Sequence, residues 1–351
     1  MITALIFIIV LGVLVLVHEF GHFITAKRSG MKVEEFGFGF PPRLFGIKKG
    51  ETTYSINWIP FGGFVKIFGE SGEEAENPRS FSSKKAGTRA KVIVAGVVMN
   101  VILAFVLLAI GNVMGLRTAI QEDDQNPLIK DRQIQIVNIA QQSPAVLVGL
   151  EPLDEIVGFN NVVEFQKYIN EHRGQKITIK IGRGGEILEK SVVPRVNPPA
   201  GEGALGINLA ATGVIKYPWY RAIYEGGRQT IFLLINTAYG YGKIIGQMFT
   251  TGSPGAELSG PIGIAKFTGQ AARIGFAYLI QLTALLSVNL AILNIIPFPA
   301  LDGGRLFFIG IEKIKRRPIS RRTENLVNSI GFALLILLMI YVTTKDISRL
   351  F

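Results

Sequence analysis

The sequence of 351 residues contains no cysteine, only 3 histidines and only 18% charged residues. The absence of cysteine excludes disulfide bonds and thiolate metal sites, so any metal ion in this protein would have to be bound by imidazole and carboxylate groups. Hydrophobic residues make up 48% of the chain and the mean hydropathy is +0.36. This composition is typical of a membrane protein with a soluble portion.

The net charge of +11 at first suggests a nucleic-acid partner. The basic residues, however, gather in two loops beside apolar segments, with 12 Lys and Arg against 7 Asp and Glu in residues 27–91 and 7 against 2 in residues 305–324. Residues 117–216 carry 11 against 12. The positive-inside rule therefore places the two basic loops in the cytoplasm, and residues 117–216 with both termini on the other side. We expect no nucleic-acid partner.

Four long apolar segments reach the length of about 20 residues that a helix needs to cross a bilayer. They are residues 2–25, 91–116, 275–296 and 325–343. The first has neither the basic start nor the small-residue cleavage site of a signal peptide, so we expect it to be retained. The sequence predicts a multi-pass α-helical membrane protein with four transmembrane helices, in an N-terminal part (1–116) and a C-terminal part (275–351).

The first apolar segment ends in the pattern His18-Glu19-Phe20-Gly21-His22, and no Lys or Arg precedes Lys27. On a helix, His18 and His22 project from one face about one turn apart, so both can bind one metal ion, while Glu19 can polarise a water molecule there. A charged residue near the bilayer centre costs about 2.5 to 3.5 kcal/mol and indicates function. This pattern predicts a hydrolytic zinc site inside a membrane helix.

Catalytic zinc sites use three protein ligands, so two histidines leave this site one ligand short. Asp302 is the best candidate, because it follows the third apolar segment and the charge pattern places it on the same cytoplasmic side as His22. It ends the stretch Asn294-Ile295-Ile296-Pro297-Phe298-Pro299-Ala300-Leu301-Asp302.

The pairing of H-E-x-x-H with N-x-x-P-x-P-x-L-D-G resembles the site-2 protease family of intramembrane zinc metalloproteases, in particular its bacterial regulator-of-sigma-E protease branch. Residues 62–66 and 260–265 also look like family segments, so the resemblance covers nearly the whole chain. It implies one Zn²⁺ held by His18, His22 and Asp302, with Glu19 as general base. The implied substrates are single-span membrane proteins, such as an anti-sigma factor or a remnant signal peptide, cleaved at the inner membrane of a bacterium.

The resemblance also suggests substrate-binding roles for Asn294 and Asn289. The alternative for both amides is hydrogen bonding between helices, and we favour a functional role for Asn294 only. Pro297 and Pro299 would break the third helix near Asp302 and expose backbone groups to substrate.

Residues 128–210 predict a compact α/β domain, with β-type runs at 134–139, 156–159, 177–181 and 187–193 around a helix at 163–172. The pattern from Ser143 to Asn161 resembles a PDZ domain, and only one such domain fits the chain. A peptide or protein C-terminus could add as a strand, with its carboxylate at residues 203–207. His172 is expected at the surface.

Residues 33–68 predict β-hairpins beside the membrane, whose free edge could pair with an unwound substrate. Residues 70–85 predict an exposed, mobile segment, to which we assign no chemistry. Residues 217–272 predict interfacial amphipathic helices.

Two other functions use the same residues. A metal transporter predicts polar residues along several spans, yet the second and fourth segments offer little beyond Asn100, Asn112, Asn328 and Ser329. An inactive scaffold predicts loss of Glu19 or of a ligand, and all are present. We therefore favour the protease.

Overall fold

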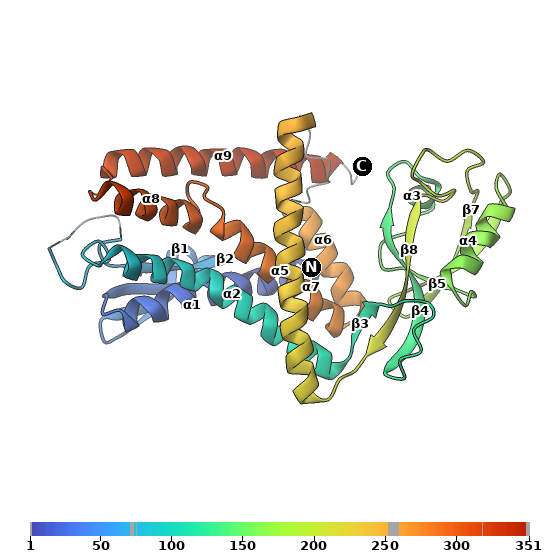
Figure 1. Cartoon of the computed structure of the whole chain (residues 1–351), viewed down its shortest axis with the longest axis horizontal. Helices are drawn as coiled ribbons and strands as arrows, with labels where there is room; N and C mark the ends of the chain where they lie inside the picture. The colour runs from blue at the N-terminus through green and yellow to red at the C-terminus, as the bar shows by residue number, and fades with distance from the viewer. Residues whose placement is uncertain (1, 71–73, 75, 252–259, 318, 349–351) are drawn as a thin grey trace. The chain divides into compact units, whose positions relative to one another are not determined.

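The computed structural model of the chain describes residues 2–70, 74, 76–251, 260–317 and 319–348, and the account below concerns these residues (Figure 1). The chain forms two compact units. The first comprises residues 1–109, 224–272 and 279–351, and the second comprises residues 110–223 and 273–278. Each unit is described by itself.

Four helices of the described chain are long and apolar enough to cross a membrane, which is consistent with the expected four spans. They are α1 (Ile2–Arg28), α2 (Ala86–Met114), α7 (Phe276–Ile295) and α9 (Arg321–Ser348). The helix α2 starts five residues before the apolar segment and stops before its end, because Gly115 has a φ of +105° and interrupts the helix ahead of Leu116. The helix α2 and the apolar segment therefore have different bounds at both ends.

Three further helices lie in the C-terminal half of the chain: α5 (Trp219–Thr251), α6 (Pro261–Ile274) and α8 (Asp302–Lys315). The first two occupy most of the segment expected to be amphipathic, of which residues 252–259 lie outside the described chain. Along α5, Trp219, Tyr220, Tyr224 and Tyr239 are exposed, as in helices that lie at a membrane interface.

Two long antiparallel strands, β1 (Val33–Lys49) and β2 (Thr52–Ile67), occupy the loop after α1. The first half of β1 pairs on both sides, since Phe36 lies opposite Val65 and also opposite Tyr54. The two strands thus form four paired segments in the spatial order 63–67, 33–38, 53–57 and 43–49. Residues 63–67 are one outer edge of this small sheet, and no described strand pairs with its far side.

The segment after β2 departs from the expectation that residues 70–85 are exposed and without chemistry. Phe81 is buried in a core with Phe23, Val33 and Ile309, and Ser80 is fully buried. The Phe81 amide donates to the Phe68 carbonyl at 2.8 Å, which ties the segment back to the base of the hairpin. The polar composition of the segment gave no indication that Phe81 is buried. Residues 71–73 and 75 of the segment lie outside the described chain.

The second unit contains a six-stranded antiparallel sheet in the order β3-β8-β4-β5-β6-β7. Its elements are β3 (Leu116–Ala119), β4 (Ile129–Ile139), α3 (Pro144–Leu147), β5 (Glu155–Val157), α4 (Val162–Glu171), β6 (Ile177–Arg183), β7 (Glu186–Val192) and β8 (Ile207–Ile215). The expected β-type runs fall on β4 to β7 and the expected helix on α4. The strand β8 was not predicted, because its central residues are small and carry no strong alternation.

Candidate metal centre

The two histidines of the first helix meet as their spacing predicts. His18 and His22 are 6% and 7% exposed, and their Nε2 atoms lie 3.1 Å apart. Residues four apart on a helix share a face, and α1 continues without interruption through both positions. The local sequence alone therefore brings the two imidazoles together.

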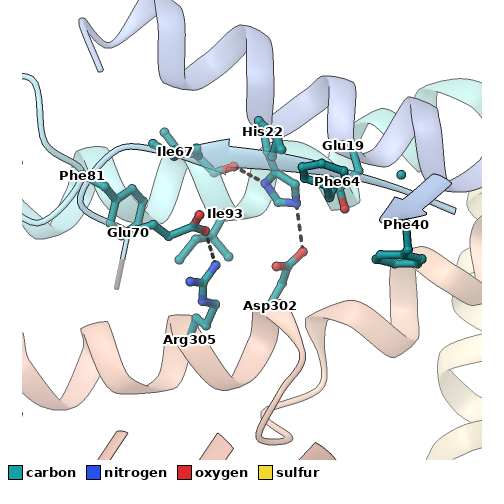
Figure 2. Close-up of a pocket in the computed structure, with 13 residues that line it drawn as sticks. Glu19, His22, Phe40, Phe64, Ile67, Glu70, Phe81, Ile93, Asp302 and Arg305 are labelled. Atoms are coloured by element: carbon teal, nitrogen blue, oxygen red, sulfur yellow. Dashed lines mark hydrogen bonds and ion pairs between the residues drawn. The ribbon is translucent and has the colours of Figure 1, made fainter. Parts of the chain in front are cut away.

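The loop between α7 and α8 brings Asp302 to the histidines. Its Oδ2 lies 3.0 Å from Nε2 of His18 and 3.2 Å from Nε2 of His22 (Figure 2 shows the pair with His22). The chain leaves α7 at Ile295 and begins α8 at Asp302, with Leu301 as the N-cap residue. This short turn places the carboxylate at the first residue of the new helix.

Two glycines after Asp302 allow this turn to be so tight. A Cβ atom on Gly303 would lie 2.1 Å from the Ile296 carbonyl oxygen, and one on Gly304 would lie 2.3 Å from the Phe298 carbonyl oxygen. No side chain fits at such distances, so the loop can fold against the start of α8 only with glycine at both positions. The pair Gly303-Gly304 thus fixes the position of the carboxylate.

The Nδ1 atoms of both imidazoles face α2. Nδ1 of His22 lies 2.8 Å from the Val92 carbonyl oxygen. Because a carbonyl oxygen only accepts, this Nδ1 carries the hydrogen and donates it, which leaves the Nε2 lone pair directed toward Asp302. Nδ1 of His18 lies 3.2 Å from the Asn100 side-chain amide. Such partners orient metal-binding histidines in proteins.

These donors fit a zinc ion. Zinc takes imidazole nitrogen and carboxylate oxygen ligands at about 2.0 Å in a tetrahedral arrangement, so its ligand atoms lie about 3.3 Å apart. Among the described residues, His18, His22 and Asp302 form a group whose ligand atoms all lie within 4.8 Å of one another. Three protein ligands leave one position open, as in catalytic rather than structural zinc sites.

Helices α1 and α2 approach closely at this site through two glycines that the sequence analysis did not single out. A Cβ on Gly21 would lie 2.3 Å from the Ala95 carbonyl oxygen, and one on Gly96 would lie 2.4 Å from Nε2 of His22. Small residues let helices in membranes pack backbone to backbone. The small-residue pair Ala95-Gly96 in an apolar segment was the available signal.

A cavity of about 300 Å³ opens beside the histidines. It is bordered by α1 through Glu19 and His22, by Asp302 of α8, and by the edge segment of β2 through Gly63 and Phe64 (Figure 2). Glu19 thus faces the same space as two of the candidate ligands. The cavity is large enough to hold water and a short stretch of backbone.

The far wall of the cavity carries an ion pair that the sequence analysis also missed. Arg305, one helical turn after Asp302, donates to Glu70 in the segment that follows β2 (Figure 2). A second ion pair joins Arg89 of α2 to Glu312 of α8 at 2.6 Å. Both pairs attach α8, and with it Asp302, to elements that are distant in sequence.

The four remaining candidate residues are placed differently. Nδ2 of Asn294 lies 3.3 Å from Nε2 of His18, within the metal centre. Asn289 instead accepts a hydrogen bond from the Tyr241 hydroxyl at 3.0 Å, so its amide links α7 to α5. Pro299 packs against α9, where a Cβ on Gly331 would lie 2.4 Å from its ring. Pro297 follows the end of α7 by two residues.

A family model described as peptidase family M50 matches residues 6–338 of the chain. The chain belongs to peptidase family M50. The match spans all four candidate membrane helices except the ends of the first and last, and it includes every residue of the metal centre.

Similar proteins match over nearly their whole length. A protein of Clostridium perfringens named as a predicted zinc metalloprotease is 37% identical over 95% of both chains. The zinc metalloprotease RasP of Oceanobacillus iheyensis is 32% identical over 100% of both chains, and RasP of Geobacillus kaustophilus is 30% identical over 98% of this chain and 97% of its own. The chain is accordingly a zinc metalloprotease of the membrane, which sets aside the transporter and scaffold alternatives.

The close approach of α2 gives a first prediction. Gly96→Ala would push a methyl group into both imidazoles, so we expect zinc affinity to fall on the order of 10- to 100-fold. Gly87→Ala on the same helix is the matched control, because a Cβ there meets nothing within 4 Å. Zinc dissociation constants from chelator competition compare the two variants. Equal affinities would show that the helix crossing does not hold the imidazoles.

Proposed function

We propose that the protein cleaves peptide bonds within or near the transmembrane segments of membrane proteins, with His18, His22 and Asp302 as the zinc ligands and Glu19 as the general base. One observation carries this proposal. Three ligand atoms from α1 and α8 lie within 4.8 Å of one another, and His18 and His22 lie inside a helix long and apolar enough to span the bilayer.

Zinc, when bound, supplies the Lewis acid that activates water and polarises the scissile carbonyl group. The Glu19 carboxylate borders the same cavity as His22 and Asp302. One of its oxygens takes a proton from the attacking water and later donates it to the nitrogen of the leaving amine. The partial burial of this carboxylate strengthens its interactions with nearby charges.

Asn294 is the proposed partner of the oxygen that becomes negative during the reaction. Its Nδ2 lies 3.3 Å from Nε2 of His18, the nitrogen that faces the metal centre. A substrate carbonyl group would be placed there. An amide N–H aimed at such an oxygen stabilises the charge that develops there. Asn289 and Pro299 are engaged with α5 and α9, so their contribution to substrate binding would pass through the position of α7 and of the loop that follows it.

The base assignment is tested by Glu19→Gln. The amide has the same size but takes no proton, so we expect zinc content to stay at the wild-type level while the cleavage rate falls about 10²- to 10⁴-fold. Glu186→Gln, at an exposed position on β7, serves as the control and should cleave at the wild-type rate. A Glu19→Gln variant that retains zinc and cleaves normally contradicts the assignment.

A membrane substrate must expose its backbone before any protease can attack it, because a helix hides its peptide bonds in its own hydrogen bonds. The edge segment 63–67 borders the cavity and has no strand partner on its far side among the described strands. An unwound substrate segment could add there as a strand, using backbone hydrogen bonds that do not depend on its sequence. Strand addition would hold the scissile bond extended beside Glu19.

With this mode of binding, the cleavage rate depends on the stability of the substrate helix. Replacing two leucines by glycines near the cleaved bond costs about 1 kcal/mol of helix stability per glycine, and we expect cleavage to become faster by several-fold. The measurement is the single-turnover rate on matched single-span substrates. Identical rates for stiff and weakened helices would count against strand addition.

The topology is proposed from the charge pattern: the active site lies toward the cytoplasmic half of the bilayer, and the second unit and both termini are extracytoplasmic. The chain has no cysteine, so single cysteines can report it directly. We expect Glu186→Cys to react with an impermeant thiol reagent in intact cells, and Lys315→Cys to react only after permeabilisation. The reverse pattern would invert the proposed topology.

Residues 128–210 are proposed to form a PDZ domain that binds a peptide or protein C-terminus. Residues 207–210 of β8 pair with β4 on one side, while β3 covers only residues 212–215 on the other side. The described chain thus leaves a short strand edge just after the loop at 203–206. A peptide added there would place its carboxylate at the backbone amides of that loop.

A further inference from the structure

Asn100 is a polar side chain in the middle of an apolar helix, and nothing in the proposed chemistry uses it. It lies on α2, one turn after Gly96, and is 0% exposed. Its Nδ2 is 3.2 Å from Nδ1 of His18. Its Oδ1 is buried and has no hydrogen-bond partner in the described part of the chain. A buried amide oxygen without a donor is destabilising.

The hydrogen bond of His22 shows which kind of partner Nδ1 of His18 needs when that ring binds a metal ion. His22 donates from Nδ1 to the Val92 carbonyl oxygen at 2.8 Å, which leaves Nε2 free to bind a metal ion. When Nε2 of His18 binds zinc, its Nδ1 likewise carries the hydrogen and needs an acceptor. An N–H of Asn100 cannot accept that hydrogen. The oxygen of the same amide can, and a half-turn of the amide group places it where Nδ2 now lies.

We propose that Asn100 is a positioning residue of the zinc site, whose Oδ1 accepts the hydrogen bond from Nδ1 of His18 and holds that ring in the zinc-binding orientation. This inference rests on the proposed role of His18 as a ligand. Val92 supplies a backbone acceptor to His22, so Asn100 would be the one side chain in this pair of contacts and the one that substitution can remove.

A second contact holds the backbone of α2 at this residue. The hydroxyl group of Ser287 on α7 donates to the backbone carbonyl oxygen of Asn100 at 2.8 Å, and Ser287 is also fully buried. The two contacts connect α7, α2 and α1 in one line that ends at His18. Hydrogen bonds between membrane helices contribute modestly to stability, so the Ser287 contact helps to hold α2 beside α7, while the Asn100 amide is the group that meets the ring of His18.

The experiment measures the zinc dissociation constant of the full-length protein in detergent by chelator competition. Asn100→Leu keeps the size but removes the acceptor, and we expect the dissociation constant to rise about 10- to 100-fold. Asn100→Asp keeps an acceptor facing Nδ1, and we expect it to bind zinc within a few-fold of the wild type. Weaker zinc binding in Asn100→Leu together with near-wild-type zinc binding in Asn100→Asp supports the inference.

Asn112→Leu is the matched control, because Asn112 is another buried amide on α2, 1% exposed and about 18 Å further along the helix at 1.5 Å per residue. It should lower the melting temperature without changing zinc affinity. Wild-type affinity in Asn100→Leu would overturn the inference, as would equal losses in the leucine and aspartate variants. If Asn100→Leu does not fold, Asn100→Ala takes its place in the same comparison.

The variant His18→Ala distinguishes a wrong zinc ligand set from a wrong role for Asn100. If His18→Ala binds zinc as tightly as the wild type, the proposed ligand set is wrong, and the inference falls with it. If His18→Ala loses zinc while Asn100→Leu and Asn100→Ala retain it, the ligand set stands and the positioning role of Asn100 alone is wrong.

Discussion

The architecture depends on one constraint: two imidazoles and a carboxylate buried among apolar helices must satisfy one another. His18 and His22 are almost fully buried, and their inner nitrogens lie 3.0 and 3.2 Å from Asp302. An unpaired charge in such surroundings would be costly. Each group is therefore stable only where the other two are, and a metal ion that all three can bind is the natural centre of the arrangement.

The rest of the first unit serves to bring these groups together. Gly96 lets α2 lie directly on the imidazoles, and Val92 and Asn100 face their outer nitrogens from that helix. The glycines after Asp302 let the loop from α7 fold against the start of α8. Ion pairs from Arg305 and Arg89 hold α8 to other elements. Close backbone packing and paired charges do the positioning, because helices in lipid gain little from apolar contact alone.

In the proposed mechanism, the small sheet of β1 and β2 brings a peptide backbone to a site within apolar helices. Strands at membrane depth are tolerated where they are buried or line a wet cavity. The edge segment 63–67 borders the cavity that contains Glu19. In the same proposal, the side of this segment that pairs with no described strand takes up an extended peptide, and Glu19 at the cavity transfers the proton.

The sequence by itself predicted four candidate spans and the pairing of His18 with His22, because hydrophobic length and helical spacing are local properties. The choice of Asp302 came from the charge pattern and from its motif. The sequence did not indicate Gly96, Asn100, Phe81 or the pair of Glu70 with Arg305, whose partners lie 70 or more residues away or, for Phe81, in a core built from several elements. It favoured Asn294 over Asn289 for a functional role, and the structure places Asn289 at α5 and Asn294 at His18. Spacing along a helix decides which side chains share a face, whereas the packing of separate helices decides what that face meets.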